Sequence, residues 1–142
     1  MIQIDDLIGV RYKKDGRNKK EGLDCYGLAI EVSKRFGHDL TDLINEVAEN
    51  ESVSFNSDSE ILFSVHDGTK YTRDISKIPV IRVDEPSEEG DLVLFLNSRH
   101  IPYHIGVYLG EGLIIHCNKF GVHIEHINQM DYLIGRVYRW QK

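Results

Sequence analysis

The chain has 142 residues, the length of one compact domain and too short for two ordinary ones. Hydrophobic residues make up 41% and charged residues 28%, and no apolar run approaches the roughly 20 residues that a membrane helix needs. The formal charge of −6 disfavours nucleic acid, which is bound by clustered Lys and Arg. We therefore expect one soluble domain over residues 1–142, with no nucleic-acid partner and no membrane insertion.

The first residues, MIQIDDLIGVRYKK, are acidic before they are basic. They lack an apolar core followed by small residues, so we expect no secretory signal peptide. The two cysteines allow at most one disulfide, whereas small disulfide scaffolds use more, so we expect two free thiols. One of them is then available for catalysis.

In chain order, residues 4–12 have the pattern of a short amphipathic helix, and the loop-like stretch KKDGRNKKEG follows. Residues 24–37 give the clearest helix signal. Asp24 is a good N-cap, apolar residues recur near helical spacing, and Gly37 follows a last turn that contains Lys and Arg. A second helix is expected within residues 39–50.

Residues 50–85 mix Ser, Asp and Asn with the short apolar pieces EILFSV and IPVIRV, and we expect this segment to be a variable extension. Short apolar runs separated by Gly or Asn come next: GDLVLFL, HIGVYLG, GLIIHC, GVHIEHI and LIGRVYRW. Helical segments followed by an antiparallel run of strands predict an α+β fold.

Cys25 directly follows the predicted cap, at the start of the clearest helix. Unsatisfied N–H groups and the helix dipole lower the pKa of a thiol at that place, and the thiolate is the reactive form. Such a nucleophile needs a partner that takes its proton and returns it to the leaving group, and histidine has the pKa for this task. Cys25 is therefore the predicted nucleophile, with one of the histidines as its base.

Strand alternation narrows the choice among the seven histidines. His104 opens the strand HIGVYLG, and His116 lies in the next strand, GLIIHC. A three-residue hairpin loop at 110–112 would place both side chains on one face, and a two-residue loop would oppose them. With the first register, His104 is the predicted base, and His116 orients its ring and fixes its tautomer, as the third member of a catalytic triad does.

A zinc site is an alternative for the same region, because His116, Cys117, His123 and His126 fall within a short span. Alternation disfavours it. His123 and His126 point to opposite faces of a regular strand, and Cys117 points away from His116. We therefore expect no metal and no other cofactor, and a packing role for Cys117.

The ordered motifs GLDCYGL, GDLVLFL, HIGVYLG and IIHC resemble the NlpC family of cell-wall cysteine peptidases. The family pattern is Asp-Cys-x-Gly-Leu, a Gly-Asp strand, His-x-Gly-x-Tyr-x-Gly and a third polar residue, often His. LIGVRY resembles the Ile-Gly-x-x-Tyr segment of the family. The resemblance implies a papain-like α+β fold, in which N-terminal helices, including the nucleophile helix, pack on an antiparallel sheet of about five or six strands.

The resemblance also implies roles around Cys25. Tyr12 would help to bind substrate or stabilise the oxyanion, Asp24 and Tyr26 would bind substrate, and the backbone N–H of Cys25 would form part of the oxyanion hole. The implied reaction is hydrolysis of a peptide bond in the peptidoglycan stem through an acyl-enzyme, without a metal. That bond typically joins the γ-carboxyl of D-glutamate to a diamino acid.

Three details resemble most closely the branch of the family found in bacteriophage tail-assembly proteins: the Asp-Gly-Arg after Tyr12, the Tyr after Cys25 and the closing GRVYRW. They imply phage tail proteins as partners, and location in the virion or in the bacterial cytoplasm before assembly. Two alternatives stay open. One is an assembly component of the tail tip with weak catalysis, and the other is an amidase or acyltransferase on the same scaffold.

Overall fold

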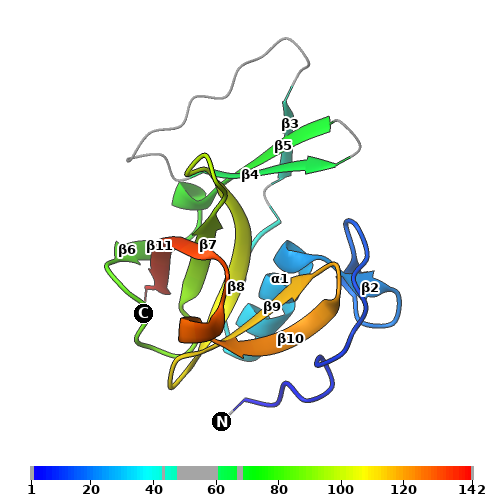
Figure 1. Ribbon diagram of the computed structural model, residues 1–142, viewed down its shortest axis with the longest axis vertical. Helices are drawn as coiled ribbons and strands as arrows, with labels where there is room; N and C mark the ends of the chain where they lie inside the picture. Colours follow the sequence, from blue (N-terminus) through cyan, green and yellow to red (C-terminus); the bar gives the residue numbers. More distant parts are fainter. Residues whose placement is uncertain (1, 43, 48–60, 67–68, 142) are drawn as a thin grey trace.

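The computed structural model describes residues 2–42, 44–47, 61–66 and 69–141 (Figure 1). The strands are β1 (Arg17–Asn18), β2 (Gly22–Leu23), β3 (Ile44–Val47), β4 (Ile61–His66), β5 (Thr69–Asp74), β6 (Val80–Val83), β7 (Leu92–Leu96), β8 (Pro102–Gly110), β9 (Leu113–Asn118), β10 (Gly121–His126) and β11 (Leu133–Trp140). Helix α1 (Cys25–Arg35) follows β2, and the 3-10 helices η1 (Ile75–Lys77) and η2 (Ile127–Gln129) follow β5 and β10.

Six of these strands form one antiparallel sheet in the order β10-β9-β8-β7-β11-β6. Helix α1 packs against β8 and β9 of this sheet. The three-stranded sheet β3-β5-β4 lies at the end of the molecule opposite the N-terminus (Figure 1). The prediction of an α+β fold with an antiparallel sheet of about five or six strands is confirmed.

Helix α1 begins where the sequence predicts. The carboxylate of Asp24 accepts a hydrogen bond of 2.7 Å from the backbone N–H of Gly27, which satisfies one of the free donors of the first turn. Gly27 is needed here because a Cβ at this position would lie 2.1 Å from the carbonyl oxygen of Gly16. The cap and this close approach together fix Cys25 at the first position of the helix.

The other predicted N-terminal helices are wrong within the described residues, where α1 is the one α-helix. Residues 5–9 form turns, and the backbone then pairs with β10 through hydrogen bonds from Gly9 to Val122 and from Val122 to Val10. Residues 44–47, expected in a second helix, form β3 and pair with β5. In both segments, bonds to distant strands replace the local bonds of a helix. Residues 43 and 48–50 lie outside the described part of the chain.

The segment 50–85, expected as a variable extension, supplies β4, β5, η1 and β6, while its residues 50–60 and 67–68 lie outside the described residues. Its described part joins the main core, because Leu62, Ile75 and Ile78 are buried in the same cluster as residues of α1. Arg73 of β5 lies over the ring of Tyr26, with its guanidinium carbon 4.3 Å from the ring centroid. The described part of the segment is therefore packed against the nucleophile helix.

The hairpin loop between β8 and β9 differs from the prediction. Gly110 pairs with Leu113, so the loop has two residues, Glu111 and Gly112, rather than three. Both have positive φ, 55° and 81°, as the two central residues of a type I′ turn require. In a regular hairpin, this loop would place the two predicted catalytic histidines on opposite faces.

A β-bulge cancels that effect. The register of β8 against β9 shifts between Tyr108 and Gly110, which adds one residue to β8 and reverses the alternation. Gly106 consequently pairs with His116, and His104 lies two residues before Gly106 on the same face. The predicted arrangement of the histidines is therefore present, although a bulge rather than the loop length produces it.

Candidate active site

His104 and His116 are joined directly in the structure. Nε2 of His104 lies 2.9 Å from Nδ1 of His116, and both side chains are buried. The ring of Tyr132 stacks on the ring of His104, with centroids 4.8 Å apart, and Phe95 packs beside both histidines. Because Nε2 of His104 bonds to His116, Nδ1 is the ring nitrogen of His104 that faces other neighbours.

Glu125 extends this pair on the side away from His104. Its carboxylate lies 3.0 Å from Nε2 of His116. Because a carboxylate only accepts hydrogen bonds, Nε2 of His116 carries the proton and Nδ1 is left as an acceptor. Nε2 of His104 is then the donor to His116, and Nδ1 of His104 holds the lone pair of a base. Glu125 thus determines the tautomers of both rings.

Sequence reasoning missed Glu125. In β10, His123 pairs directly with His116 and Glu125 is two residues farther on, so all three side chains lie on one face. The sequence did contain a signal for this pairing. Residues 118–121 form a short turn-like stretch between two apolar runs, and such a stretch predicts a tight hairpin with this register. The prediction considered β10 alone and did not pair it with β9.

Burial lowers the pKa of His104 to about 3, and His116 and His123 lower it further in the same direction. Burial also lowers the pKa of His116, against the opposing effect of its hydrogen bond to Glu125. His104 is consequently neutral at pH 7. A neutral imidazole can take a proton from a thiol, as the predicted role of His104 requires.

Cys25 is partly buried at the N-terminus of α1, and burial raises the pKa of its thiol to about 11, with the neighbouring Asp24 carboxylate acting in the same direction. The N–H groups of Ile105 and Tyr26 oppose this shift. Desolvation by burial outweighs these N–H groups, so the net shift of this pKa is upward, opposite to the direction expected from the helix start alone. The sulfur lies close to the main chain of Ile105, next to His104, and its pairing with the imidazole stays a prediction.

Tyr12 lies beside the nucleophile. Its backbone forms a β-bridge with Leu23, two residues before Cys25, and its side chain is 37% exposed. Burial raises the pKa of the Tyr12 hydroxyl, and Asp24 and Cys25 raise it further. A neutral, partly exposed phenol near the thiol is suited to donating a hydrogen bond to substrate, and the predicted role of Tyr12 stays a prediction.

Asp24 and Tyr26 have structural contacts. The Asp24 carboxylate accepts from Arg17 at 2.7 Å in addition to capping α1. The Tyr26 hydroxyl donates to the carbonyl oxygen of Thr41 at 2.7 Å, and its side chain is 1% exposed. Contact with substrate would require both side chains to leave these positions, and their predicted role in substrate binding stays a prediction.

The Asp of the Gly-Asp strand motif also stabilises the fold. Asp91 is buried and accepts hydrogen bonds from Arg139 of β11 and from the backbone N–H groups of Ser87 and Glu88. This ion pair joins the start of β7 to the last strand of the chain. The motif GDLVLFL and the closing segment GRVYRW are therefore bonded to one another, and this bond stabilises the fold.

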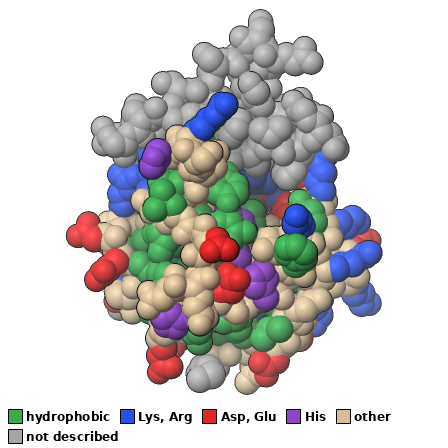
Figure 2. Space-filling view, viewed as in Figure 1, with side chains coloured by type: hydrophobic (Ala, Val, Ile, Leu, Met, Phe, Trp, Pro, Cys, Tyr) green, Lys and Arg blue, Asp and Glu red, His purple; other side chains and the backbone are tan. Residues whose placement is uncertain are grey.

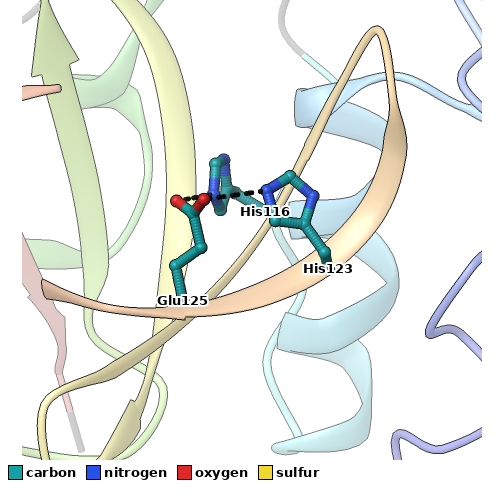
Figure 3. A group of neighbouring side chains, drawn as sticks. All are labelled: His116, His123 and Glu125. Atoms are coloured by element: carbon teal, nitrogen blue, oxygen red, sulfur yellow. Dashed lines mark hydrogen bonds and ion pairs between the residues drawn. The ribbon is translucent and has the colours of Figure 1, made fainter. Parts of the chain in front are cut away.

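Cys25 and Cys117 are free thiols, as predicted. Cys117 is buried, and its thiol donates to the carbonyl oxygen of Leu23 at 3.1 Å, so its predicted packing role is confirmed. Figure 3 shows His116, His123 and Glu125 pointing toward one another from β9 and β10. Two imidazoles and a carboxylate can hold a metal ion.

Residues 9–139 match the sequence model of the NlpC/P60 family. The chain belongs to the NlpC/P60 family. Members of the family are generally cysteine peptidases or amidases. The predicted resemblance is confirmed at the level of this family. No curated protein matches the chain.

Solved structures agree on the fold. A NlpC/P60 family protein from Bacillus cereus has a TM-score of 0.64 at 20% identity, covering 96% of this chain and 37% of its own. NlpC2 and NlpC1 from Trichomonas vaginalis also have TM-scores of 0.64, at 17% and 16% identity. They cover 96% and 98% of this chain and 44% and 42% of their own. This chain therefore spans less than half the length of each neighbour. The TM-scores confirm the predicted papain-like α+β fold.

No helix among the described residues is long and apolar enough to span a membrane.

Proposed function

We propose that the chain is a cysteine peptidase that cleaves a peptide bond in the peptidoglycan stem through an acyl-enzyme. The bond is the one between the γ-carboxyl of D-glutamate and a diamino acid. The observation that carries the proposal is the hydrogen-bonded series of buried His104, buried His116 and partly exposed Glu125. The series holds a neutral imidazole, His104, next to Ile105, whose main chain contacts the sulfur of Cys25. The family supports the chemical class.

In the first step, Nδ1 of His104 accepts the thiol proton of Cys25 while the sulfur attacks the carbonyl carbon of the stem peptide. The oxyanion that forms accepts a hydrogen bond from the backbone N–H of Cys25, which has no partner within the first turn of α1. Tyr12 donates a second one. The proton on Nδ1 then passes to the leaving amine, the carbon–nitrogen bond breaks, and the acyl group stays on sulfur as a thioester.

In the second step, His104 takes a proton from water as the water oxygen attacks the thioester carbonyl. The carbon–sulfur bond breaks, the carboxylic acid product leaves, and the proton returns to sulfur. Throughout both steps, His116 accepts from Nε2 of His104 and Glu125 accepts from Nε2 of His116. This series stabilises the imidazolium that forms transiently at His104.

A pocket of about 510 Å³ beside His104 can receive the substrate. Tyr103 and Tyr132 line it, and both rings also contact the ring of His104. Phe120, which is 83% exposed, forms another part of the wall. Aromatic walls of this kind bind the apolar parts of a ligand at low cost in conformational entropy.

The phage tail is the proposed means of delivery, and its support is the resemblance of the Asp-Gly-Arg segment and of the closing GRVYRW to tail-assembly members of the family. A tail protein would bring an acidic catalytic domain to the similarly anionic wall. Copurification of the chain with phage or prophage tail particles tests this part, and its absence from purified particles would contradict it.

Digestion of purified muropeptides with different stem chemistries, followed by mass spectrometry, tests the reaction. The wild type is expected to cut the γ-D-glutamyl bond, Cys25→Ala to be inactive, and Cys117→Ala to retain activity as the matched thiol control. Cleavage at another amide would favour the amidase alternative. Absence of cleavage across the panel, with Cys25 reduced and open to alkylation, would favour the assembly component and refute the proposed reaction.

A further inference from the structure

The cluster of His116, His123 and Glu125 contains one contact, between His123 and Glu125, that needs a positive charge to be favourable. Nδ1 of His123 lies 3.0 Å from the carbonyl oxygen of Gly121, which can only accept, so Nδ1 carries a proton. In the neutral ring, Nε2 then holds a lone pair. This nitrogen lies 3.4 Å from the Glu125 carboxylate, so two acceptors face each other. A cation or a proton between them is required to make this contact favourable.

The distances fit a metal ion. The possible ligand atoms of the three residues all lie within 4.8 Å of one another, and the Glu125 oxygens are 3.0 Å from Nε2 of His116 and 3.4 Å from Nε2 of His123. Zinc bonds of about 2.0–2.2 Å in a tetrahedral arrangement separate neighbouring ligand atoms by about 3.4 Å. The carbonyl of Gly121 orients His123 in the way that outer-shell partners orient zinc ligands.

A cation can reach this cluster from solvent. The side chains of His123 and Glu125 are 32% and 35% exposed, and both line the pocket beside the active site. Asp131 adds another carboxylate to that pocket. Figure 2 shows acidic and histidine side chains next to each other in the middle of this face. Negative charge at the mouth of a pocket raises the local concentration of cations.

We propose that His116, His123 and Glu125 form a binding site for a divalent transition-metal ion, with Zn²⁺ as the best fit, and that the bound ion switches the peptidase off. The three protein ligands leave a fourth position for water. Binding does not depend on the reaction, whereas the inhibitory effect rests on the proposed function of His104 as the base.

The switch works through tautomers. A metal ion on Nε2 of His116 replaces the proton that Glu125 now accepts, and that proton leaves to solvent. The Nε2 proton of His104 then crosses to Nδ1 of His116, and Nδ1 of His104 takes one proton from water, so the two rings carry two protons before and after. His104 then has no lone pair on Nδ1 and cannot accept the thiol proton of Cys25.

Calorimetric titration of the full chain with Zn²⁺ tests the site, in a Cys25→Ser background that removes the thiol as a competing ligand. We expect one ion per chain, and loss of a ligand in His123→Gln should weaken binding by more than the roughly 10- to 100-fold that loss of an outer-shell partner costs. His126→Gln is the matched control on the same strand and should bind as the parent does. Absence of binding, or equal binding by the His123→Gln variant, would overturn the site.

Nitrogen-15 spectra of the histidine rings test the switch without any substrate. In the same background, His104 should carry its proton on Nε2 without metal and on Nδ1 with Zn²⁺, and the His123→Gln variant should not change. In the active chain, saturating Zn²⁺ should lower the rate by about 10⁴-fold, the cost of a wrong histidine tautomer in a serine peptidase triad. For the active chain and for its His123→Gln variant, the rate with Zn²⁺ is compared with the rate of the same protein without metal. Metal binding without a change of the His104 tautomer would refute the switch, and inactivity toward every muropeptide would refute only the proposed reaction.

Discussion

The carboxylate of Glu125 is hydrogen-bonded to a fully buried histidine, His116, at 3.0 Å. This bond fixes the proton of His116 on Nε2, and the fixed proton in turn fixes the tautomer of His104. The tautomer of His104, the proposed base, is therefore determined by a carboxylate that His104 does not touch and that is one-third exposed. Changes at Glu125 should consequently alter the tautomer of His104, in addition to altering the pocket wall that Glu125 helps to form.

Glu125→Ala should lower kcat by about 10- to 100-fold, the loss known for outer-shell partners of metal-bound histidines. Glu125→Gln should recover most of the loss, because its amide oxygen can still accept from Nε2 of His116. Steady-state kinetics on a defined stem peptide measures both, with Glu85→Ala as the exposed control. Equal losses in the Gln and Ala variants would contradict a role in fixing the tautomer.

His116→Ala should lower kcat by about 10³-fold, because His104 loses the acceptor that selects its tautomer. His116→Asn should be clearly more active, since Oδ1 of asparagine occupies the place of Nδ1 and accepts the same hydrogen bond. Circular dichroism confirms that both variants fold. If His116→Asn is no better than His116→Ala, the bond between the two histidines is not what matters.

Alkylation of Cys25 by iodoacetamide should be slow at neutral pH and should accelerate as the pH rises toward about 11. The reason is that burial raises the pKa of this thiol and so favours its neutral form in the folded protein. A stopped-time assay over pH 5 to 11, in a Cys117→Ala background, measures the profile. A rate already at its plateau at pH 5 would instead indicate a preformed thiolate–imidazolium pair.

Asp91→Asn should lower the free energy of unfolding at pH 7 by about 2 kcal/mol, because a buried carboxylate that accepts charged and backbone donors is lost. Burial raises the pKa of Asp91, but the ion pair with Arg139 and the N–H groups of Glu88 and Ser87 lower it more, so the folded pKa is below its ordinary value. The stabilisation is thus present above the unfolded pKa and is lost as the pH falls through the folded pKa.

Urea unfolding at pH 7 and pH 3 measures this dependence. The difference between wild type and Asp91→Asn should shrink at the lower pH, whereas Asp84→Asn, an exposed control, should match the wild type at both. A constant difference would show that the charge of Asp91 is not responsible.

Tyr26→Phe should reduce stability by about 1 kcal/mol, because the hydroxyl loses its bond to the carbonyl oxygen of Thr41 inside the protein. The kinetic constants for the stem peptide should not change, since the side chain is 1% exposed. Thermal unfolding and the peptide assay together measure the two effects. A raised KM with unchanged stability would restore the expectation that Tyr26 binds substrate.

Local signals made the nucleophile helix predictable. Asp24 as cap and the basic last turn act within a few residues of the positions they determine, so the bounds of α1 follow from the sequence. Strand alternation similarly placed His104 and His116 on one face, although the supposed loop length was wrong. A bulge and a longer loop both add one residue, and sequence alone does not separate them.

Interactions between distant segments explain what the sequence did not reveal. The turns near Gly9 pair with β10, more than a hundred residues later, and this pairing overrides a weak helical pattern. Glu125 matters only because β10 pairs with β9, and the pKa of Cys25 depends on burial that no local pattern reports. These features depend on tertiary neighbours rather than on local propensity.

The contacts of Asp42 determine how the protein could be shortened. Its carboxylate forms ion pairs with Arg17 of β1 at 2.9 Å and with Arg73 of β5 at 3.3 Å, and Arg73 in turn covers the ring of Tyr26. Excision of the segment around β5 would uncover one side of α1 and remove Arg73 from the Asp42 carboxylate. A shortened version of the chain should therefore lose exposed loops first and keep β5 in place.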